Sequence, residues 1–459
     1  MDRTRRVLLS AGGLAAAATP LAVAVGAADA ATPRRLGSQR PFHGNMSVTE
    51  FDVFPNIPAD QTAALQKALD RAAERKAVLT LPPGHYLTRP LTLRPGSHIA
   101  GCGPQTRLIQ IGIGPVLSAR VAHRVTVEDM TLDGAMRPLG DTAGGVLKLE
   151  AVAQVTLNRL HITQSSFNGI SLIGCGGTVR DVRIDEVAQT GLFALDGNRL
   201  LVEACTVETC ANNGIQIWQS APREDGSLVI NNRIAKIRTD DGGSGQNGNG
   251  INVFRAGNVT VQGNHITDCA YSAVRGNSAS NMTIIGNQGH RLGEVALYAE
   301  FAFQGAVIAQ NLIDNAATGI SVTNFNDGGR LATIQGNVVR NLKRREFEPV
   351  DQRGTGIAAE ADSAITGNVV EGAPSSGIWV GMREYMRNVV VNGNIVRASR
   401  YGVAISGNAQ AGMGMISNNV FSDIRSGAVR LVDGYDAYGQ DIGSGFSNAR
   451  LNVTGNMVS

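Results

Sequence analysis

Short runs in which apolar and polar residues alternate recur along most of the chain, with glycine and asparagine between the runs. The clearest unit reads Val-x-Val-x-Gly-Asn-x-Ile over residues 259–266, and the apolar pair Ala273-Val274 follows it. Alternation with a period of two is typical of β-strands, and glycine or asparagine at the boundaries indicates tight turns. Each unit therefore predicts two or three short strands joined by corners.

The unit repeats through the C-terminal half of the sequence. Successive asparagines are separated by as few as 23 residues (264 to 287) and as many as 37 (419 to 456). Repetition at such a period indicates a solenoid. The corner pair recurs at residues 286–287, 310–311, 336–337, 367–368, 393–394, 418–419 and 455–456, and weaker copies have Asn232, Cys205, Val182 and Leu160 at the asparagine position.

Strands this short cannot bury an apolar face alone, so we expect the coils to stack, with neighbouring strands about 4.8 Å apart. The predicted fold is an all-β, single-stranded right-handed parallel β-helix. Independent hairpins would not explain a Gly-Ile-x-Val run at a nearly constant offset after each corner. Asparagine tolerates a left-handed corner, and its amide can bond the coils above and below. We predict a buried ladder of Asn264, Asn287, Asn311, Asn337, Asn368 and Asn394.

The start of this domain has a different pattern. Residues 60–76 predict an amphipathic helix with Asp60 as its N-cap. Because the end of a β-helix exposes an apolar cross-section and unpaired strand edges, a helix is expected to cap it. We assign residues 48–110 to this capping segment with the first coils, and residues 111–459 to the β-helix repeats. The apolar face of the helix is Ala64, Leu65, Ala68, Leu69 and Ala72.

The first 30 residues have the pattern of a twin-arginine signal peptide. Arg5-Arg6 precedes Val7-Leu8-Leu9, a weakly apolar alanine-rich stretch follows, and Ala28-Asp29-Ala30 offers a cleavage site. Pro20 interrupts the stretch, which favours cleavage over membrane anchoring. Residues 31–47 have the composition of a linker. We expect a periplasmic or secreted protein with no membrane span after the signal is removed.

Replacing both Arg5 and Arg6 with lysine is expected to leave the precursor in the cytoplasm, because this pathway recognises the arginine pair. Fractionation followed by immunoblotting measures the outcome. Normal export of the double variant would contradict the assignment.

Composition narrows the function further. A net charge of +3 without a basic run argues against nucleic acid as a partner. The five cysteines include no Cys-x-x-Cys pair, which argues against a disulfide framework or a zinc ribbon. We expect free thiols, since Cys210 and Cys269 fall at equivalent places in repeats with another coil between them, beyond the reach of about 7 Å between Cα atoms.

The N-terminal block resembles that of pectate-lyase-like β-helix proteins, on Phe51-Asp52-Val53, residues 60–69, Leu81-Pro82-Pro83-Gly84-His85-Tyr86 and Gly101-Cys102-Gly103. That superfamily includes polygalacturonases, rhamnogalacturonases, uronate epimerases and phage tailspikes. With the signal and the Gly-Asn repeats, the whole chain resembles the twin-arginine-translocated repeat proteins. The polygalacturonase motif set and the Asp-Pro-His-Asp motif of alginate epimerases are absent, and Gly289-His290-Arg291 only half resembles one part. The resemblance therefore implies the fold and transfers no catalytic residue.

Alternation in the Gly-Ile-x-Val-x strands places every second side chain on the outer surface, where two columns form a groove. The groove is expected to hold Arg275, Tyr298, Glu300 and Glu360 as candidate catalytic residues, all facing solvent. Aromatic rings beside polar groups suit the apolar faces and polar edges of sugars. The candidate binding residues are Trp218, Phe254, Asn252, Asn277 and Trp379.

These residues allow three interpretations: the site of an inverting glycosidase, the site of a lyase or epimerase, or a solvated surface without a catalytic role. With one coil between them, the Cα atoms of Glu300 and Glu360 should lie about 9–10 Å apart, near the limit for the two carboxyl groups of an inverting glycosidase. A lyase or epimerase acting on a uronic acid needs a cation and a base, for which Arg275 and Tyr298 are candidates.

Six loops are expected to wall the groove: residues 221–227, 238–249, 324–330, 342–355, 382–388 and 433–450. Asp240, Asp241 and Asn247 in the second loop offer oxygen ligands for calcium, and an ordinary glycine-rich turn is the alternative interpretation.

The leading hypothesis is an exported protein that binds, and by one interpretation cleaves or epimerises, an acidic polysaccharide. The alternative is a non-catalytic β-helix that binds a glycan or supports the envelope. Fold alone does not decide between them, because function depends on the site.

Overall fold

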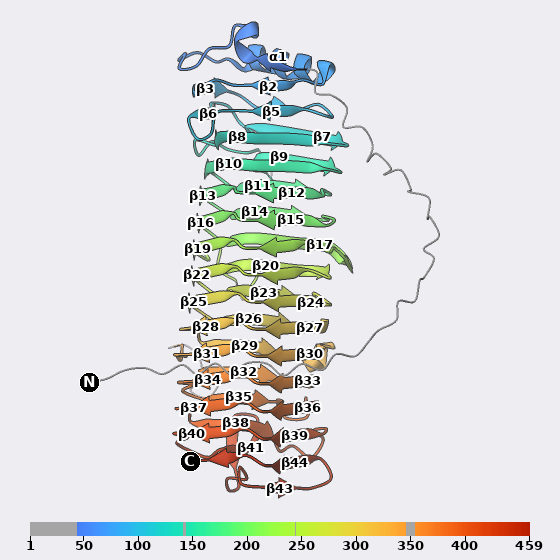
Figure 1. The fold of residues 1–459 in the computed structure, drawn as a ribbon, viewed down its shortest axis with the longest axis vertical. Coiled ribbons are helices and arrows are strands. Elements are labelled where there is room, and N and C mark those ends of the chain that lie inside the picture. Colours follow the sequence, from blue (N-terminus) through green and yellow to red (C-terminus); the bar gives the residue numbers. More distant parts are fainter. Residues whose placement is uncertain (1–43, 141–143, 244, 346–353) are drawn as a thin grey trace, which may run out of the picture. The chain divides into compact units, whose positions relative to one another are not determined.

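A computed structural model describes residues 44–140, 144–243, 245–345 and 354–459. Within these residues the chain winds into a stack of coils, each built from short strands (Figure 1). The predicted signal peptide and most of the predicted linker lie outside the described residues. The last residues of the linker, Asn45–Ser47, form strand β1 and pair in parallel with β2.

Each coil contributes one strand to each of three parallel stacks, which the chain visits in the same order every time. Neighbouring strands within a stack belong to successive coils, so nearly all hydrogen-bond partners are about one coil apart in sequence. The prediction of an all-β parallel solenoid is confirmed.

The first stack carries the columns that were predicted to form a groove. It comprises β4 (Leu91–Thr92), β7 (Leu117–Ala122), β9 (Gly145–Val152), β11 (Asn168–Ile173), β14 (Thr190–Leu195), β17 (Asn213–Glu224), β20 (Asn249–Gly257), β23 (Val274–Asn277), β26 (Val295–Glu300), β29 (Thr318–Val322), β32 (Thr355–Ala359), β35 (Ser376–Val380), β38 (Tyr401–Ser406), β41 (Val429–Asp433) and the antiparallel β42 (Asp436–Tyr438).

The second stack precedes the asparagine corner. It comprises β1, β2 (Val78–Thr80), β5 (His98–Ala100), β8 (Val125–Asp133), β10 (Val155–Ser165), β12 (Gly177–Arg180), β15 (Leu200–Glu203), β18 (Leu228–Ile230), β21 (Thr260–Gln262), β24 (Met282–Ile285), β27 (Gln304–Ala309), β30 (Arg330–Gln335), β33 (Ala361–Thr366), β36 (Arg387–Asn392), β39 (Gly414–Ser417), β44 (Leu451–Thr454) and the antiparallel β43 (Phe446–Ser447).

The third stack follows the corner, and β8 and β10 continue around the corner into it. Its other strands are β3 (Gly84–Thr88), β6 (Thr106–Gln110), β13 (Arg183–Val187), β16 (Thr206–Cys210), β19 (Arg233–Ile237), β22 (His265–Cys269), β25 (Gln288–Leu292), β28 (Leu312–Asp314), β31 (Val338–Arg340), β34 (Val369–Glu371), β37 (Ile395–Arg397), β40 (Val420–Ser422) and β45 (Met457–Val458).

The predicted asparagines stand in one buried column between the second and third stacks. Asn337 shows the pattern: its Oδ1 accepts hydrogen bonds from the backbone N and the Nδ2 of Asn311, both at 3.0 Å. Its Nδ2 donates to Asn368 Oδ1 at 2.9 Å and to the carbonyl of Ile308 at 3.0 Å. The same pattern joins Asn232, Asn264, Asn287, Asn311, Asn337, Asn368, Asn394, Asn419 and Asn456.

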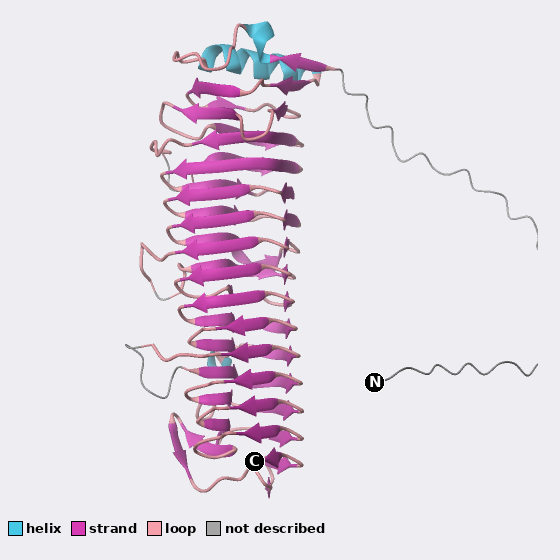
Figure 2. Cartoon of the chain, turned by 60° about the vertical axis from the view of Figure 1, so that its left-hand side comes forward, coloured by secondary structure: helices cyan, strands magenta, loops and turns pink. Residues whose placement is uncertain are grey.

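One longer helix lies across the first coils, and Figure 2 shows helical structure mainly at this end. α1 spans Thr62–Arg75 and buries Leu65, Ala68, Leu69 and Ala72, as the amphipathic pattern predicts. The N-cap is Gln61 rather than Asp60. Asp60 instead accepts a hydrogen bond from the backbone N of Thr62 at 2.9 Å and forms an ion pair with Arg89. Two short 3-10 helices, η1 (Val48–Phe51) and η2 (Phe325–Asp327), complete the helical structure of the described residues.

All five cysteines are free thiols, as expected. Cys210 and Cys269 pair with the same residue, Ile237, from opposite sides, which places one coil between them. Cys102 is exposed, whereas the other four are buried. Burial raises the pKa of the Cys205 and Cys210 thiols to about 12, so these two are unreactive at neutral pH.

Candidate functional site

The outer surface of the first stack contains the two predicted columns in register. Pairing joins Asn252 to Arg275, Arg275 to Tyr298 and Tyr298 to Ser321, then continues through Ala358 to Trp379. The second column joins Trp218, Phe254, Asn277 and Glu300. The stacking of coils therefore brings together residues that are 21 to 37 positions apart in sequence, as Ala358 to Trp379 (379 − 358 = 21) and Ser321 to Ala358 (358 − 321 = 37) show.

Aromatic side chains occupy the upstream part of this surface. The Trp218 ring lies between Phe193 and Phe254, with centroids 5.9 and 5.4 Å away in edge-to-face geometry. Trp218 Nε1 donates to Asn252 Oδ1 at 3.1 Å. These rings are half-buried, so they hold each other in place and still present an edge to solvent.

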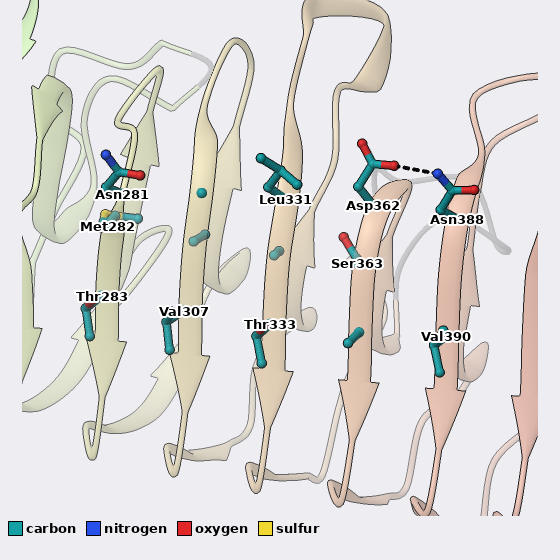
Figure 3. A pocket seen from close by; sticks show the side chains of 14 residues that line it. Asn281, Met282, Thr283, Val307, Leu331, Thr333, Asp362, Ser363, Asn388 and Val390 are labelled. Atoms are coloured by element: carbon teal, nitrogen blue, oxygen red, sulfur yellow. Dashed lines mark hydrogen bonds between the residues drawn. The ribbon is translucent and has the colours of Figure 1, made fainter.

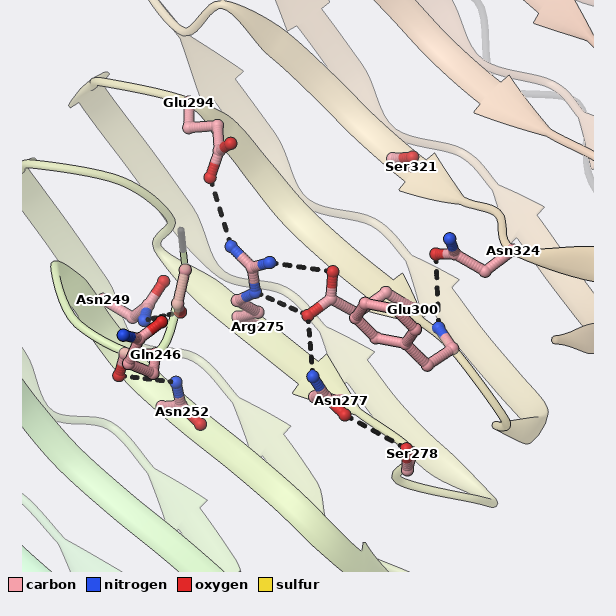
Figure 4. A network of polar contacts seen from close by, with 12 residues as sticks. Gln246, Asn249, Asn252, Arg275, Asn277, Ser278, Glu294, Glu300, Ser321 and Asn324 are labelled. Atoms are coloured by element: carbon pink, nitrogen blue, oxygen red, sulfur yellow. Dashed lines mark hydrogen bonds and ion pairs between the residues drawn. The ribbon is translucent and has the colours of Figure 1, made fainter. Parts of the chain in front are cut away.

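A closed ion-pair network follows them. The Arg275 guanidinium donates to Glu300 in bidentate fashion, with Nε–Oε1 at 2.7 Å and Nη2–Oε2 at 2.8 Å (Figure 4). Its Nη1 lies 3.2 Å from Glu294 Oε2, and Glu294 also pairs with Arg345 at 3.4 Å. Asn277 Nδ2 donates to Glu300 Oε1 at 3.1 Å. Two arginines and two glutamates thus neutralise one another.

The expectation that Arg275 and Glu300 face solvent is wrong. They project from the outer surface, but only 6% of Arg275 and 2% of Glu300 is exposed. Gly245, shortly before β20, lies so close to the guanidinium that a Cβ on this residue, at φ +135°, would be 2.1 Å from Arg275 Cζ. Only glycine can therefore occupy this position. Strand alternation correctly predicted the face of the sheet on which Arg275 and Glu300 lie, but it did not predict the loop residues that cover them.

Neither Arg275 nor Tyr298 has the protonation behaviour of a base. Burial raises the pKa of Tyr298, and the neighbouring Glu300 carboxylate raises it further. The Arg275 pKa also lies above its usual value, because the paired glutamates outweigh its burial. Both groups keep their protons at neutral pH, so the structure does not support proton abstraction by this pair.

A pocket of about 120 Å³ opens on the downstream side of the network. Tyr298, Glu360 and Trp379, all predicted site residues, line it together with the hydroxyls of Ser321 and Thr323. The remaining lining residues are Val295, Thr318, Thr355, Ala358, Ala359, Met382 and Tyr435. This pocket has aromatic walls, several hydroxyl groups and one carboxyl group, and it is the candidate functional site. Its opening is called the mouth below.

Glu360 is the one titratable carboxyl group among the described lining residues. Its Oε2 accepts a hydrogen bond from the backbone N of Phe325 at 2.7 Å. Burial raises the Glu360 pKa above its ordinary value, and this hydrogen bond offsets part of the effect. Glu300 does not line the pocket and is committed to Arg275, so the predicted pair of cooperating carboxylates is not assembled there.

Trp379 is not the open aromatic platform that the sequence suggested. Only 8% of it is exposed, because Tyr435 from the loop after β41 covers it with ring centroids 5.9 Å apart. Its Nε1 donates to the carbonyl of Gly381 at 2.8 Å. Trp379 forms the base of the pocket, and Tyr435 supplies the exposed ring at its mouth.

In the loop that was considered as a calcium site, Asp240, Asp241 and Asn247 bind different partners. Asp240 forms an ion pair with Arg238 at 2.8 Å, whereas Asp241 accepts from Asn212 Nδ2 at 2.9 Å. Asn247 donates to the carbonyl of Gly242. The three groups serve different partners, which is the arrangement of a turn. Among the residues that the structure describes, no group of three His, Cys, Asp or Glu side chains could hold a metal ion.

A larger cavity of about 630 Å³ lies on the outer surface of the second stack, across β24 to β36 (Figure 3). Its floor is Thr283, Val307, Thr333 and Val390, and Asp362 at its edge is already paired with Arg387. With no aromatic ring in its lining and its one carboxylate neutralised, it offers less specific chemistry than the Tyr298–Glu360–Trp379 pocket.

Three overlapping segments, residues 121–242, 168–328 and 223–385, match the family described as "right handed beta helix region". The chain belongs to this right-handed β-helix family. The match covers more than half of the sequence and agrees with the stacked coils and their corners. None of the curated proteins matches this β-helix chain significantly.

Solved structures share the fold of the β-helix chain at low sequence identity. The N-terminal fragment of bacteriophage Phi29 gene product 12 superposes with a TM-score of 0.55 at 14% identity, over 86% of this chain and 74% of that one. Two others are the A-module of a mannuronan C-5 epimerase from Azotobacter vinelandii (TM-score 0.45, 16% identity, 90% and 99% covered) and a surface adhesin of Streptococcus pneumoniae (0.43, 15%, 84% and 99%). These likenesses concern the fold alone.

Sequence reasoning missed four residues that shape the site of this β-helix protein: Glu294, Arg345, Met382 and Tyr435. All four lie in corners or loops, outside the strand columns. No period connects them to the strands beside them. Arg345, Met382 and Tyr435 lie in loops that were predicted to wall the groove, which was the only available signal for them, and Glu294 lies in a short corner outside those loops. In the part of the chain that the structure describes, no helix is long and apolar enough to cross a membrane.

Proposed function

We propose that this is an exported glycan-binding protein that holds a sugar chain along the groove of the first stack. Export rests on the Arg5-Arg6 pattern and the Ala28-Asp29-Ala30 site, which also support a place among the twin-arginine-translocated repeat proteins. Binding rests on the pocket between Tyr298, Glu360 and Trp379.

The main support for the proposal is that aromatic rings and groups able to hydrogen-bond sugar hydroxyls line the same pocket. Sugars present apolar ring faces and hydroxyl edges, so a binding site for them needs an aromatic ring and nearby polar groups. Tyr435 offers an exposed ring, and Ser321, Thr323 and Glu360 offer donors and acceptors beside it. The pocket is smaller than the roughly 300 Å³ of a typical ligand site, so it suits one end or one ring of a longer chain.

The charge of the mouth favours neutral sugars over uronic acids. No arginine or lysine is among the described residues that line it, and its one titratable carboxyl group is Glu360. The nearby Arg275 is neutralised by Glu300 and Glu294. A bound carboxylate would therefore find no cation among the lining residues, which weakens the case for an acidic polysaccharide.

Binding fits the geometry better than catalysis. Inverting hydrolysis needs two carboxyl groups about 6.5–9.5 Å apart across the bond, and Glu300 is excluded from the mouth by its pairing with Arg275. Elimination or epimerisation needs a base, and Tyr298 keeps its proton. Glu360 by itself supplies a polar contact.

Replacing Tyr435 with alanine is expected to weaken glycan binding about fivefold, because the ring lost is worth roughly 1 kcal/mol. Tyr438 on the adjoining strand β42 gives a matched control: it is similarly exposed (43% against 37%) but does not line the pocket. Affinity electrophoresis with a panel of neutral and uronate polysaccharides measures both variants.

The same panel decides the class of sugar and the question of catalysis. Glu360→Gln is expected to keep binding of neutral chains and to improve binding of uronate chains, since it removes a negative charge. Absence of binding to every polysaccharide, or equal binding by the two tyrosine variants, would overturn the proposal. Release of reducing ends or unsaturated products by the wild type, lost in Glu360→Gln, would show an enzyme instead.

A further inference from the structure

An exposed aliphatic stripe runs down the third stack, away from the groove. Its members occupy the first outward position after the asparagine corner in six successive coils, and backbone pairing places each directly beside the next. They are 38% to 69% exposed. The stripe is formed by Leu312, Val338, Val369, Ile395, Val420 and Met457. The first five lie on β28, β31, β34, β37 and β40, which are labelled in Figure 1, and Met457 lies on β45. At about 4.8 Å per coil it is roughly 24 Å long.

The stripe begins abruptly. The same column upstream reads His161, Arg183, Thr206, Arg233, His265 and Gln288, all polar, on strands of the same geometry. Because upstream strands of the same geometry carry polar residues at this position, the coil itself does not require the apolar residues that begin at Leu312. A contiguous exposed apolar surface of this kind marks an interaction site.

A charged column lies beside the stripe, two residues further along each strand. Successive coils carry Asp314, Arg340, Glu371 and Arg397, so the sign alternates from coil to coil. Within the chain, Arg340 pairs with Asp314 and Arg397 with Glu371, each at 2.9 Å. Both arginines and Glu371 are about half exposed, and Arg397 also pairs with Asp423 at 3.0 Å. Their exposed faces remain accessible to a second copy of the chain.

We infer that this face joins two copies of the chain in an antiparallel dimer. If two stripes pack with the solenoids parallel, the charged columns lie on opposite sides of the contact and do not meet. If the solenoids run antiparallel, the two-fold axis follows the strands and the columns face each other in reverse order.

The alternating charges fit the antiparallel arrangement. With the two-fold axis between the coils of Val338 and Val369, Arg340 faces Glu371 of the partner subunit, and Asp314 faces Arg397 of the partner subunit. Every facing pair is then opposite in sign. Val338 packs on Val369 of the partner subunit and Leu312 packs on Ile395 of the partner subunit, so this contact uses the first four members of the stripe, and Val420 and Met457 lie beyond it. The alternating column is thus complementary to itself only when reversed.

The first test is the mass of the wild-type mature protein in solution, by light scattering or sedimentation over a concentration series. It is expected to form dimers, and Val369→Glu is expected to be monomeric because it buries two carboxylates at the centre of the contact. Thr206→Glu, in the same column but above the stripe, is the control and should remain dimeric. A wild type that stays monomeric at every concentration, or a Val369→Glu variant that still associates, would overturn the inference.

Charge reversal tests the orientation and leaves the stripe intact. Arg340→Glu is expected to weaken the dimer at least about tenfold, because like charges then face each other across the two-fold axis. Combining it with Glu371→Arg restores both facing pairs and should recover the dimer. Within each chain the double variant places like charges beside Asp314 and Arg397, so the contacts inside the subunit become less favourable. A recovered dimer would therefore have to come from the facing pairs of the antiparallel register. A double variant weaker than either single one would exclude this register. Glycan binding plays no part in either test.

Discussion

The variant Asn337→Leu is expected to lower the free energy of unfolding by about 2–4 kcal/mol, because it breaks the asparagine ladder at its centre. The backbone N and Nδ2 of Asn311 lose their acceptor, and the carbonyl of Ile308 loses its donor. Asn337 is fully buried, so water cannot replace these bonds. Denaturant unfolding followed by circular dichroism measures the change.

Gln335→Leu provides the control for the ladder. Gln335 belongs to the same coil, but its side chain is exposed, so its replacement should change the free energy of unfolding by less than about 0.5 kcal/mol. Equal effects of the two substitutions would mean that the ladder amides do not contribute beyond an ordinary surface amide.

The second large effect is expected for Arg275→Ala. This substitution leaves Glu300 and Glu294 buried without the cation between them, and breaking a buried ion pair in this way costs about 3–5 kcal/mol. Arg275 is 6% exposed, so solvent screening gives little relief. Lower stability by denaturant unfolding is the expected result, and glycan binding at the Tyr435 mouth should persist at temperatures where the variant is folded.

Arg180→Ala is the matched control for the ion pair. Arg180 pairs with Glu203 at 2.6 Å across neighbouring coils, but its side chain is 54% exposed. Exposed pairs contribute at most about 1 kcal/mol. If Arg275→Ala were no more destabilising than Arg180→Ala, the network around Arg275 would be open to solvent in solution and available to a ligand.

Together, the two variants and their controls distinguish polar residues that stabilise this solenoid from polar residues that are available to a ligand. The ladder and the Arg275 network bury polar groups that satisfy one another, and both contribute to the stability of the fold. The pocket beside Tyr435 is instead lined by hydroxyls and the Glu360 carboxyl group, where a ligand can replace water. The groove of the first stack is therefore divided into a closed segment and an open one.

Much of the fold could be predicted because one coil repeats the next. The alternation of Ile251, Asn252 and Val253 predicts which side chains enter the core and which point out, and the structure has all three in those places. The corner asparagines set the register between coils, and with this register Arg275 and Tyr298 stand side by side in one outward column. Local pattern suffices here because each strand pairs only with the coils above and below.

The sequence by itself thus determined the stacked coils, the ladder and the two outward columns, since each follows from a period along the chain. Only the tertiary structure decided which outward residues are accessible. Gly245 lies over Arg275, and Tyr435 covers Trp379 from a loop more than fifty residues away (435 − 379 = 56). Loops have no period, and their path depends on packing against strands already in place. The solvent exposure of a site, unlike its register, is therefore a property of the folded whole.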